Sequence, residues 1–279
     1  MEDYQIKFIY EAAYAALKTD FFKIPAQCPE GEKAALRILD VFGISDKEKC
    51  EAFLQEYKSR QLEEDSAILY EKMQELNPPS FFQGLSSSEL LLYHSCNYEV
   101  SYGYGRNISR IFDFTGKKIA DIGGSSGGLL SAVMESFTGA SSYVFDLPEA
   151  CERGRELKSN IHYIECDFFK DSPKGKYDCV ILSNILHDYD DEKCICILNN
   201  MADILKDCEN IFIYEDILFE NGKEPVEALL YGFRLSVNFR GARQRTVGEL
   251  SALLRKSGIN MELTNIYNFK EHTCLIYAK

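Results

Sequence analysis

From about residue 117 onward the chain alternates short apolar segments with helical ones, and this alternation limits its fold more than any other feature. The apolar segments have the length and composition of strands, and most lie a helix and two loops apart. They are KKIADIG, SSYVFDLP, IHYIECD, YDCVILSN, NIFIYEDIL, NMELTNIY and HTCLIYAK. The alternation predicts a doubly wound α/β fold, a largely parallel sheet covered by helices. Because only a short NFKEH segment separates the last two strands, we expect an antiparallel hairpin at the C-terminal edge.

The chain before about residue 112 lacks this strand pattern and predicts helices. Tyr4–Leu17 is rich in alanine and aromatic residues, and Ala34–Phe42 has apolar residues at helical spacing. Two more helical stretches follow, the charged amphipathic Cys50–Leu76 and the shorter Ser88–Cys96. The prolines at 78 and 79 interrupt the third stretch, and the fourth leads into the glycine- and tyrosine-rich segment YEVSYGYGRN. We therefore expect a helical N-terminal region, residues 1–84, and an α/β domain, residues 85–279.

Charge and composition narrow the possible partners. With 46% hydrophobic and 27% charged residues, 279 residues are enough to bury a full core. A net charge of -13 argues against nucleic acid or an anionic membrane surface as main partner, because both would repel the protein. The N-terminus has no apolar signal segment, and no uncharged run is long enough to span a bilayer. We expect a cytoplasmic protein that acts on small molecules.

The ten cysteines predict neither a zinc site nor a disulfide framework. They are scattered and include no C-x-x-C pair, so no metal site is expected. Several, such as Cys179 in a strand segment, have the setting of small core residues. We expect reduced, buried thiols.

The segment ADIGGSSGG, residues 120 to 128, predicts a ligand-binding turn. A strand runs directly into a glycine cluster, and LLSAVMESF then reads as a helix, so the backbone can approach a ligand at a helix N-terminus. Gly123, Gly124, Gly127 and Gly128 do not have the G-x-G-x-x-G spacing of dinucleotide-binding folds. The pattern instead places Asp121, Gly123 and Gly127 in order at the end of the first strand.

Acidic residues also follow the next two strands. Asp146 ends the second strand, where a carboxylate can accept hydrogen bonds from a ribose diol. The alternative for Asp146 is an N-cap for the helix PEACERGREL. Asp167 and Phe168 follow the third strand and could hold the amine and the face of an adenine, although such a pair is common in loops. Three such elements in order indicate a nucleoside-containing cofactor.

These segments resemble one enzyme family. DIGGSSG, FDLPE, CDFF, SNILHDYDDE and GARQRT, in this order, are similar to the S-adenosylmethionine-dependent O-methyltransferases of the plant and bacterial small-molecule type, which include caffeate, acetylserotonin and polyketide O-methyltransferases. The resemblance covers residues 85 to 279. It implies a class I methyltransferase domain of seven strands that binds S-adenosyl-L-methionine, and an N-terminal helical region that forms a homodimer and closes over the substrate.

The resemblance also implies roles for single residues. Gly123 and Gly124 would face the methionine part of the cofactor, Asp146 the ribose, and Asp167 with Phe168 the adenine. The full cofactor set that it implies is Asp121, Gly123, Gly124, Gly127, Asp146, Leu147, Asp167, Phe168 and Ser183.

Two of the cofactor positions depart from the family pattern. Ser125 stands where the pattern usually has a third glycine. Ser183 stands where plant members often carry a lysine that contacts adenine.

His187 follows the strand YDCVILSN and is the candidate general base. Methyl transfer is an in-line displacement, and a phenol with a pKa of about 10 reacts better once a neutral imidazole takes its proton. Asp190, Asp191 and Glu192, which follow, are explained as the cap and first-turn acids of the next helix. The alternative for His187 is a buried histidine satisfied by the backbone.

Two further residues are the expected partners of that base. The resemblance implies an acid at the end of the fifth strand that orients the imidazole, and we assign it to Glu215 rather than Asp216, which faces the opposite way in an extended segment. Gln244 stands where the pattern has a second acid. Its amide oxygen can hold a ring nitrogen but carries no charge to stabilise imidazolium.

Four functions remain open. The first is O-methylation of a small aromatic or polyketide-like metabolite, and the second uses the same cofactor with altered chemistry, which Gln244 makes possible. The third is a cofactor-binding or dimerising protein without catalysis, and the fourth, opposed by the glycine spacing, is a dinucleotide-dependent oxidoreductase. The segment from 226 to 241 and the aromatic residues of SYGYGRN and PSFFQGL would border the acceptor site or pack in the core.

Overall fold

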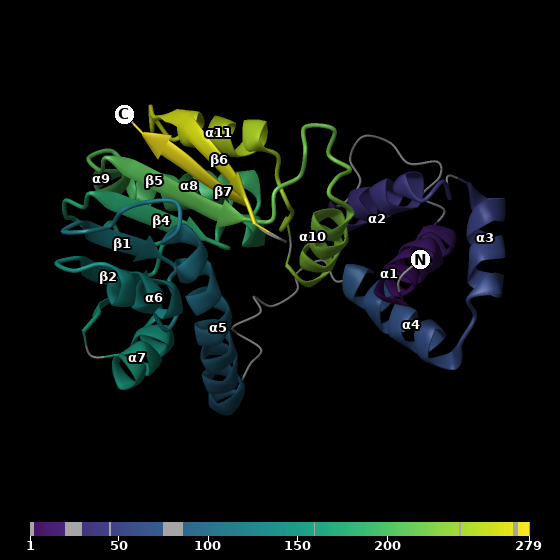
Figure 1. The fold of residues 1–279 in the computed structure, drawn as a ribbon. Coiled ribbons are helices and arrows are strands. Elements are labelled where there is room, and N and C mark those ends of the chain that lie inside the picture. Colours follow the sequence, from purple (N-terminus) through teal and green to yellow (C-terminus); the bar gives the residue numbers. More distant parts are fainter. Residues whose placement is uncertain are drawn as a thin grey trace. The chain divides into compact units, whose positions relative to one another are not determined.

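The computed structural model describes residues 3–19, 30–44, 46–74, 86–158, 160–239, 241–269 and 273–278, which form two compact units (Figure 1). The helical unit takes its residues from Met1–Phe81, His187–Asp190 and Ile217–Thr246. The sheet unit takes its residues from Phe82–Leu186, Asp191–Asp216 and Val247–Lys279. Because the helical unit includes two segments from the C-terminal half, neither unit is continuous in sequence. The division between residues 84 and 85 stays a prediction.

All seven predicted strands are present and form one sheet. They are β1 Lys118–Ile122, β2 Ser141–Asp146, β3 His162–Glu165, β4 Cys179–Ser183, β5 Asn210–Glu215, β6 Glu262–Asn268 and β7 Thr273–Ala278, in the order β3-β2-β1-β4-β5-β7-β6. β1 to β5 pair in parallel, and β7 pairs antiparallel with both β5 and β6. The predicted C-terminal hairpin and doubly wound fold are therefore confirmed. The strand order reverses between β1 and β4, where ligands bind in folds of this type.

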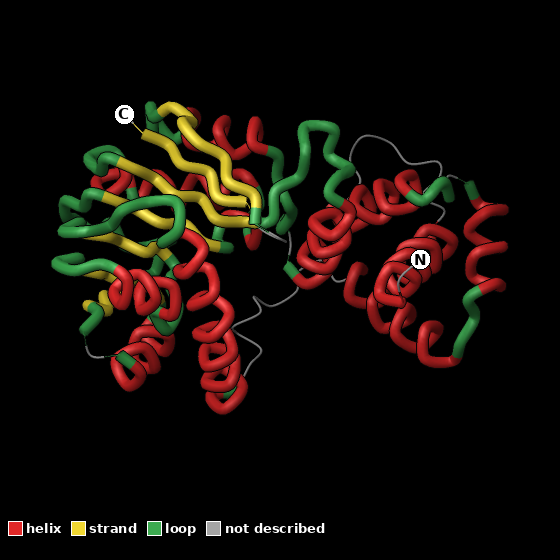
Figure 2. The backbone as a smooth tube through the Cα atoms, viewed as in Figure 1, coloured by secondary structure: helices red, strands yellow, loops and turns green. Residues whose placement is uncertain are grey.

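Helices cover both faces of this sheet. They are α5 Ser87–Ile108, α6 Gly128–Ser136, α7 Pro148–Leu157, α8 Asp191–Asn200, α9 Ala202–Leu205 and α11 Val247–Lys256. Figures 1 and 2 show α5, α6 and α7 on one face of the sheet and α8, α9 and α11 on the other. Leu129 and Val133 of α6 pack with Ile119 and Val144 of the sheet in one buried cluster. This burial of apolar surface is the main force that holds the layers together.

Helix α5 is longer than predicted. The helix expected to end at Cys96 continues through YEVSYGYGRN to Ile108. A Cβ atom on Gly105 would lie 2.1 Å from the carbonyl oxygen of Leu129, and one on Gly128 would lie 2.1 Å from that of Tyr98. The glycines therefore let α5 and α6 approach closely instead of ending the helix. Tyr104 packs against the sheet, with its ring centroid 4.9 Å from that of Tyr214.

The helical unit consists of α1 Asp3–Thr19, α2 Glu30–Val41, α3 Lys47–Glu56, α4 Arg60–Gln74 and α10 Val226–Asn238. Ala12, Ile38 and Phe233, from three of these helices, share its buried core. The prediction of one helical stretch over Cys50–Leu76 is wrong, because α3 ends at Glu56 and α4 begins at Arg60. The Ser59 hydroxyl accepts the Leu62 N–H at 3.2 Å and so caps a new helix. The aromatic segment PSFFQGL lies outside the described residues.

Candidate cofactor and catalytic sites

The glycine loop between β1 and α6 is as tight as its sequence predicts. Gly123 and Gly127 have left-handed backbone conformations, with φ of +76° and +82°. A Cβ atom on Gly123 would lie 2.0 Å from Cδ1 of Ile185, and one on Gly124 would lie 2.6 Å from a carboxyl oxygen of Asp121. No larger residue fits at either position without movement of its neighbours.

Ser125 is left-handed as well, with φ of +50°. Its N–H donates to Oδ2 of Asp146 at 2.7 Å, and its hydroxyl lies 2.9 Å from Nδ1 of His94 on α5. His94 is buried, and burial lowers the pKa of its imidazole. His94 carries no sign of this contact in the sequence, because nothing local links a helical histidine to a loop 31 residues further on.

The carboxyl group of Asp121 is buried, and no described residue replaces the hydrogen bonds it would make to water. It is 1% exposed, and neither carboxyl oxygen has a hydrogen-bond partner among the described residues. Burial raises the pKa of Asp121 to about 8, and the nearby charge of Asp146 contributes. Such an acid is expected where a ligand supplies the missing donors.

Asp146 lies at the end of β2 and faces the glycine loop. Its two carboxyl oxygens accept the N–H groups of Ser125 and Leu147, each at 2.7 Å. Burial raises the pKa of Asp146 to about 6, against the opposing effect of these two hydrogen bonds. The N-cap of α7 is Leu147, so Asp146 is not the cap that the alternative required.

The other cofactor candidates follow β3 and end β4. Asp167 accepts the Phe169 N–H at 3.0 Å and pairs with Lys170 at 2.5 Å, which holds the pKa of this carboxyl below its usual range. An edge atom of the Phe168 ring lies 3.6 Å from where a Cβ on Gly123 would be, so this ring borders the glycine loop. Ser183 is the last residue of β4, beside β1 in the parallel sheet. The structure thus brings the predicted cofactor residues to one edge of the sheet unit.

His187 lies in the short 3₁₀ turn Leu186–Asp188 and is 4% exposed. Its Nε2 is 3.4 Å from a carboxyl oxygen of Asp188, a neighbour that the sequence interpretation did not single out. The edge of one ring meets the face of the other between His187 and Tyr231 of α10, with centroids 6.1 Å apart at 72°. The carbonyl of His187 accepts the Arg243 N–H at 2.9 Å. The candidate base therefore contacts the carboxylate of Asp188 and the ring of Tyr231, and its backbone carbonyl is held by Arg243.

Glu215 ends β5 and is 1% exposed. Its Oε1 accepts the backbone N–H of Leu186 at 2.8 Å. Leu186 directly precedes His187, so Glu215 anchors the start of the turn that carries the histidine. Asp216 is buried too, at 9% exposed.

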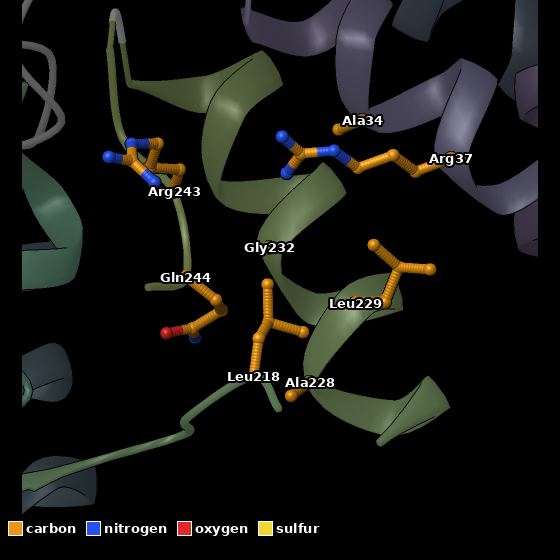
Figure 3. A pocket seen from close by; sticks show the side chains of 8 residues that line it. All are labelled: Ala34, Arg37, Leu218, Ala228, Leu229, Gly232, Arg243 and Gln244. Atoms are coloured by element: carbon orange, nitrogen blue, oxygen red, sulfur yellow. The ribbon is translucent and has the colours of Figure 1, made fainter. Parts of the chain in front are cut away.

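Gln244 is 2% exposed, and neither atom of its amide has a hydrogen-bond partner among the residues that the structure describes. Its stem lies against α10, where a Cβ on Gly232 would be 3.1 Å from Cγ of Gln244. It borders a small hollow within the helical unit (Figure 3). The other lining residues are Ala34, Arg37, Leu218, Ala228, Leu229, Gly232 and Arg243. The predicted bond from Gln244 to the imidazole is thus not formed in this structure.

The described ranges contain no candidate for a metal site or a membrane-spanning helix. Within them, no group of three or more His, Cys, Asp and Glu side chains is arranged to hold a metal ion. None of the helices in the described part of the chain has the length and apolarity needed to cross a bilayer.

The chain resembles known methyltransferases in sequence and in fold. Mitomycin biosynthesis 6-O-methyltransferase of Streptomyces lavendulae is 29% identical over 178 residues, 61% of this chain and 50% of that protein. An O-methyltransferase family 2 protein of Planctomyces limnophilus, solved in complex with apigenin, has a TM-score of 0.78 at 14% identity and covers 99% of this chain and 94% of its own. Human N-acetylserotonin methyltransferase, solved with SAM, has a TM-score of 0.67 at 21% identity, over 99% of this chain and 96% of its own.

These likenesses differ in what they show. The solved structures, at such low identity, show the shared fold, and the predicted class I methyltransferase architecture is confirmed. The chain spans about half the length of the curated relatives it matches. A sequence profile of the O-methyltransferase domain matches residues 67–260, well over half of the chain. The chain therefore belongs to the O-methyltransferase family.

Proposed function

We propose that this protein transfers a methyl group from S-adenosyl-L-methionine to a phenolic hydroxyl of a small aromatic or polyketide-like metabolite, with His187 as general base. The observation that carries the proposal is the edge formed by the glycine loop, Asp121 and Asp146 in a chain of this family. The relatives support the reaction class, since their names describe O-methyltransferases that act on small molecules.

The residues of the sheet unit fit the cofactor. Asp121 has two buried oxygens that accept no hydrogen bond from a described residue. The methionine part of the cofactor carries an ammonium group that supplies hydrogen-bond donors. Gly123 and Gly124 leave a cradle that any Cβ would fill. Asp146 uses one lone pair of each oxygen on backbone N–H groups, so each oxygen can still accept a ribose hydroxyl.

The rest of the cofactor would contact the neighbouring strand ends. We assign the adenine to Asp167, Phe168 and Ser183, and the backbone of Gly127 and Leu147 completes the site. When bound, S-adenosyl-L-methionine supplies a methyl group on a positively charged sulfur.

The chain's own contribution to the reaction is to position the acceptor and remove its proton. We assign the removal of this proton to His187, because a phenol of pKa about 10 is a better nucleophile when ionised. The carboxylate of Asp188, 3.4 Å away, favours the protonated ring that results. Glu215, through the Leu186 N–H, and Arg243, through the His187 carbonyl, hold the turn in place. A fixed turn matters because in-line displacement depends on orientation.

The remaining expectations are part of the same proposal. We propose that residues 1–84 form the dimerisation and lid region of a homodimer and that residues 85–279 bind the cofactor. We place the protein in the cytoplasm with a small-molecule acceptor as partner. A net charge of -13 supports the exclusion of nucleic acid and anionic membranes.

A second candidate keeps the cofactor but changes the chemistry to N-, S- or C-methylation, or to a reaction without methylation. It is favoured by Gln244, which is uncharged and makes no hydrogen bond to the imidazole. An acceptor that ionises more easily than a phenol, or an amine that is already nucleophilic, needs less help from a supported base.

Calorimetric titration with S-adenosylhomocysteine tests the cofactor assignment. We expect micromolar dissociation constants, on the order of 1–100 μM, and at least tenfold weaker binding by Asp146→Ala. No heat of binding at about millimolar ligand would contradict both candidates. If the cofactor binds, a panel of phenols, amines and thiols then separates them, since methylation of amines or thiols alone favours the second.

A further inference from the structure

The serine in the middle of the glycine loop is in an unusual conformation. Ser125 has φ of +50°, and among the described residues only Ser125 and Asn184 combine a side chain with a positive φ. The left-handed region is unfavourable for residues with a Cβ, and serine lacks the preference that asparagine has for it. A serine in this conformation therefore needs interactions that hold it there.

His94 of α5 provides such an interaction. Its Nδ1 lies 2.9 Å from the Ser125 hydroxyl, and its own backbone carbonyl accepts the Ser126 hydroxyl at 2.8 Å. His94 is 6% exposed and Ser126 is fully buried, so water does not compete for these bonds. Two successive residues of the loop are thus tied to one residue of the helix.

Burial determines the state of the imidazole. It lowers the pKa of His94, against a smaller opposing effect of Glu149. A neutral ring has one donor and one acceptor nitrogen, so Nδ1 can accept from the hydroxyl or donate to it. In either tautomer the contact with Ser125 is a hydrogen bond.

The same serine holds the acid assigned to the ribose. The Ser125 N–H donates to Oδ2 of Asp146 at 2.7 Å, and the Leu147 N–H donates to Oδ1. The φ of Ser125 sets the angle between this N–H and the chain that continues into α6, so the left-handed backbone and the bond to Asp146 are linked. A chain of contacts therefore runs from His94 through Ser125 to Asp146.

We propose that His94 is a positioning residue for the cofactor: it keeps Ser125 left-handed and so orients the Asp146 carboxylate toward the ribose hydroxyls. The inference rests on the proposed function, because it assumes that this edge binds S-adenosyl-L-methionine. Glycine adopts the left-handed region without penalty, so a glycine at position 125 would make His94 unnecessary for affinity.

A double-mutant cycle on the affinity for S-adenosylhomocysteine tests this. We expect His94→Ala to weaken binding about tenfold, since it removes one buried hydrogen bond that fixes the loop. Ser125→Gly should stay within about twofold of the wild type, and the double variant should bind like Ser125→Gly alone. A histidine that only fills space would lower affinity equally in both backgrounds, and such additivity would overturn the inference.

Two further variants keep the test decisive if His94→Ala does not fold. Ser125→Ala retains the Cβ but loses the hydroxyl, so it should weaken binding as much as His94→Ala does. His94→Asn offers an amide at the place of Nδ1 and should retain most of the affinity. Wild-type affinity in Ser125→Ala would contradict the role of His94. By contrast, failure of the wild type to bind S-adenosylhomocysteine would refute the proposed function instead.

Discussion

The buried acids of the two units differ in what surrounds them. Asp121 in the sheet unit has no hydrogen-bond partner among the described residues. The charge that acts on its pKa is that of a second acid, Asp146, which raises it further. Glu11 in the helical unit is equally buried, at 2% exposed, and its Oε2 also has no hydrogen-bond partner among the described residues, but its Oε1 lies 4.0 Å from Lys7 and 3.9 Å from Arg234. Burial raises the pKa of both acids, and only Glu11 has cations that oppose the rise.

We interpret Glu11 as a structural acid and propose that Asp121 is a ligand-binding one. A buried carboxyl beside two cations has a sufficient reason to exist within the fold, because breaking such a pair is costly. A buried carboxyl without a donor lowers stability and gains from a ligand that supplies one. We therefore expect changes at the edge of the sheet unit to act on cofactor affinity, and changes around His187 to act on turnover.

His187→Ala tests this division of roles most directly and should have the largest effect. We expect turnover of an accepted phenol to fall by roughly two or more orders of magnitude, because a general base contributes about that much, while S-adenosylhomocysteine affinity stays within a few fold. Steady-state kinetics and calorimetry on the same variant measure the two effects. His162→Ala, at an exposed histidine of β3, is the matched control and should change neither. Undiminished turnover in His187→Ala would show that positioning alone suffices.

Asp121→Asn should change the pH dependence of stability. An unfolded aspartate titrates near about 3.9, whereas burial raises the pKa of Asp121 to about 8. Between these values the folded state holds a proton that the unfolded chain has lost, so stability falls as the pH rises through this window. The asparagine has no proton to lose. The melting temperature of Asp121→Asn should therefore exceed that of the wild type by an amount that grows from pH 4 to pH 8 and reaches about 2–4 °C or more.

The same variant should bind the cofactor less well. We expect a loss of about tenfold in S-adenosylhomocysteine affinity, because the neutral amide cannot form an ion pair with the ligand's ammonium group. Thermal unfolding over the pH range and calorimetry at pH 7 test the two statements together. A pH-independent difference in melting temperature, or unchanged affinity, would place Asp121 with Glu11 as a structural acid.

The strand pattern predicted the sheet well because strands and their ends are local features. Apolar runs located all seven strands, and the acids and glycines directly after them could be placed at one edge by topology alone. The course of α5 past Cys96 could not be predicted, since Gly105 is explained by its contact with Leu129 on another helix. Likewise the break before α4 depends on a single serine cap within a helical pattern.

The supporting contacts of the candidate site were harder to predict. The left-handed conformation of Ser125 and its contact with His94 join positions 31 residues apart, and no periodicity links them. The anchoring of Leu186 by Glu215 is similar, because the family pattern indicated the acid but not the backbone group that it accepts from. Tertiary contacts of this kind are specified by packing rather than by local sequence.

Gln244→Glu should have the smallest effect. It compares an uncharged with a charged side chain at one buried position of the helical unit. Gln244 is buried beside α10, and its amide has no hydrogen-bond partner among the described residues. If a carboxylate there reached the imidazole, it would stabilise the protonated ring and raise the pKa seen in the rate profile, with turnover of a phenol rising a few fold. Gln244→Leu is the control, because it keeps the approximate volume without a polar group. The pH–rate profiles of the three proteins decide the matter. Identical profiles would mean that the base does not need a charge at position 244.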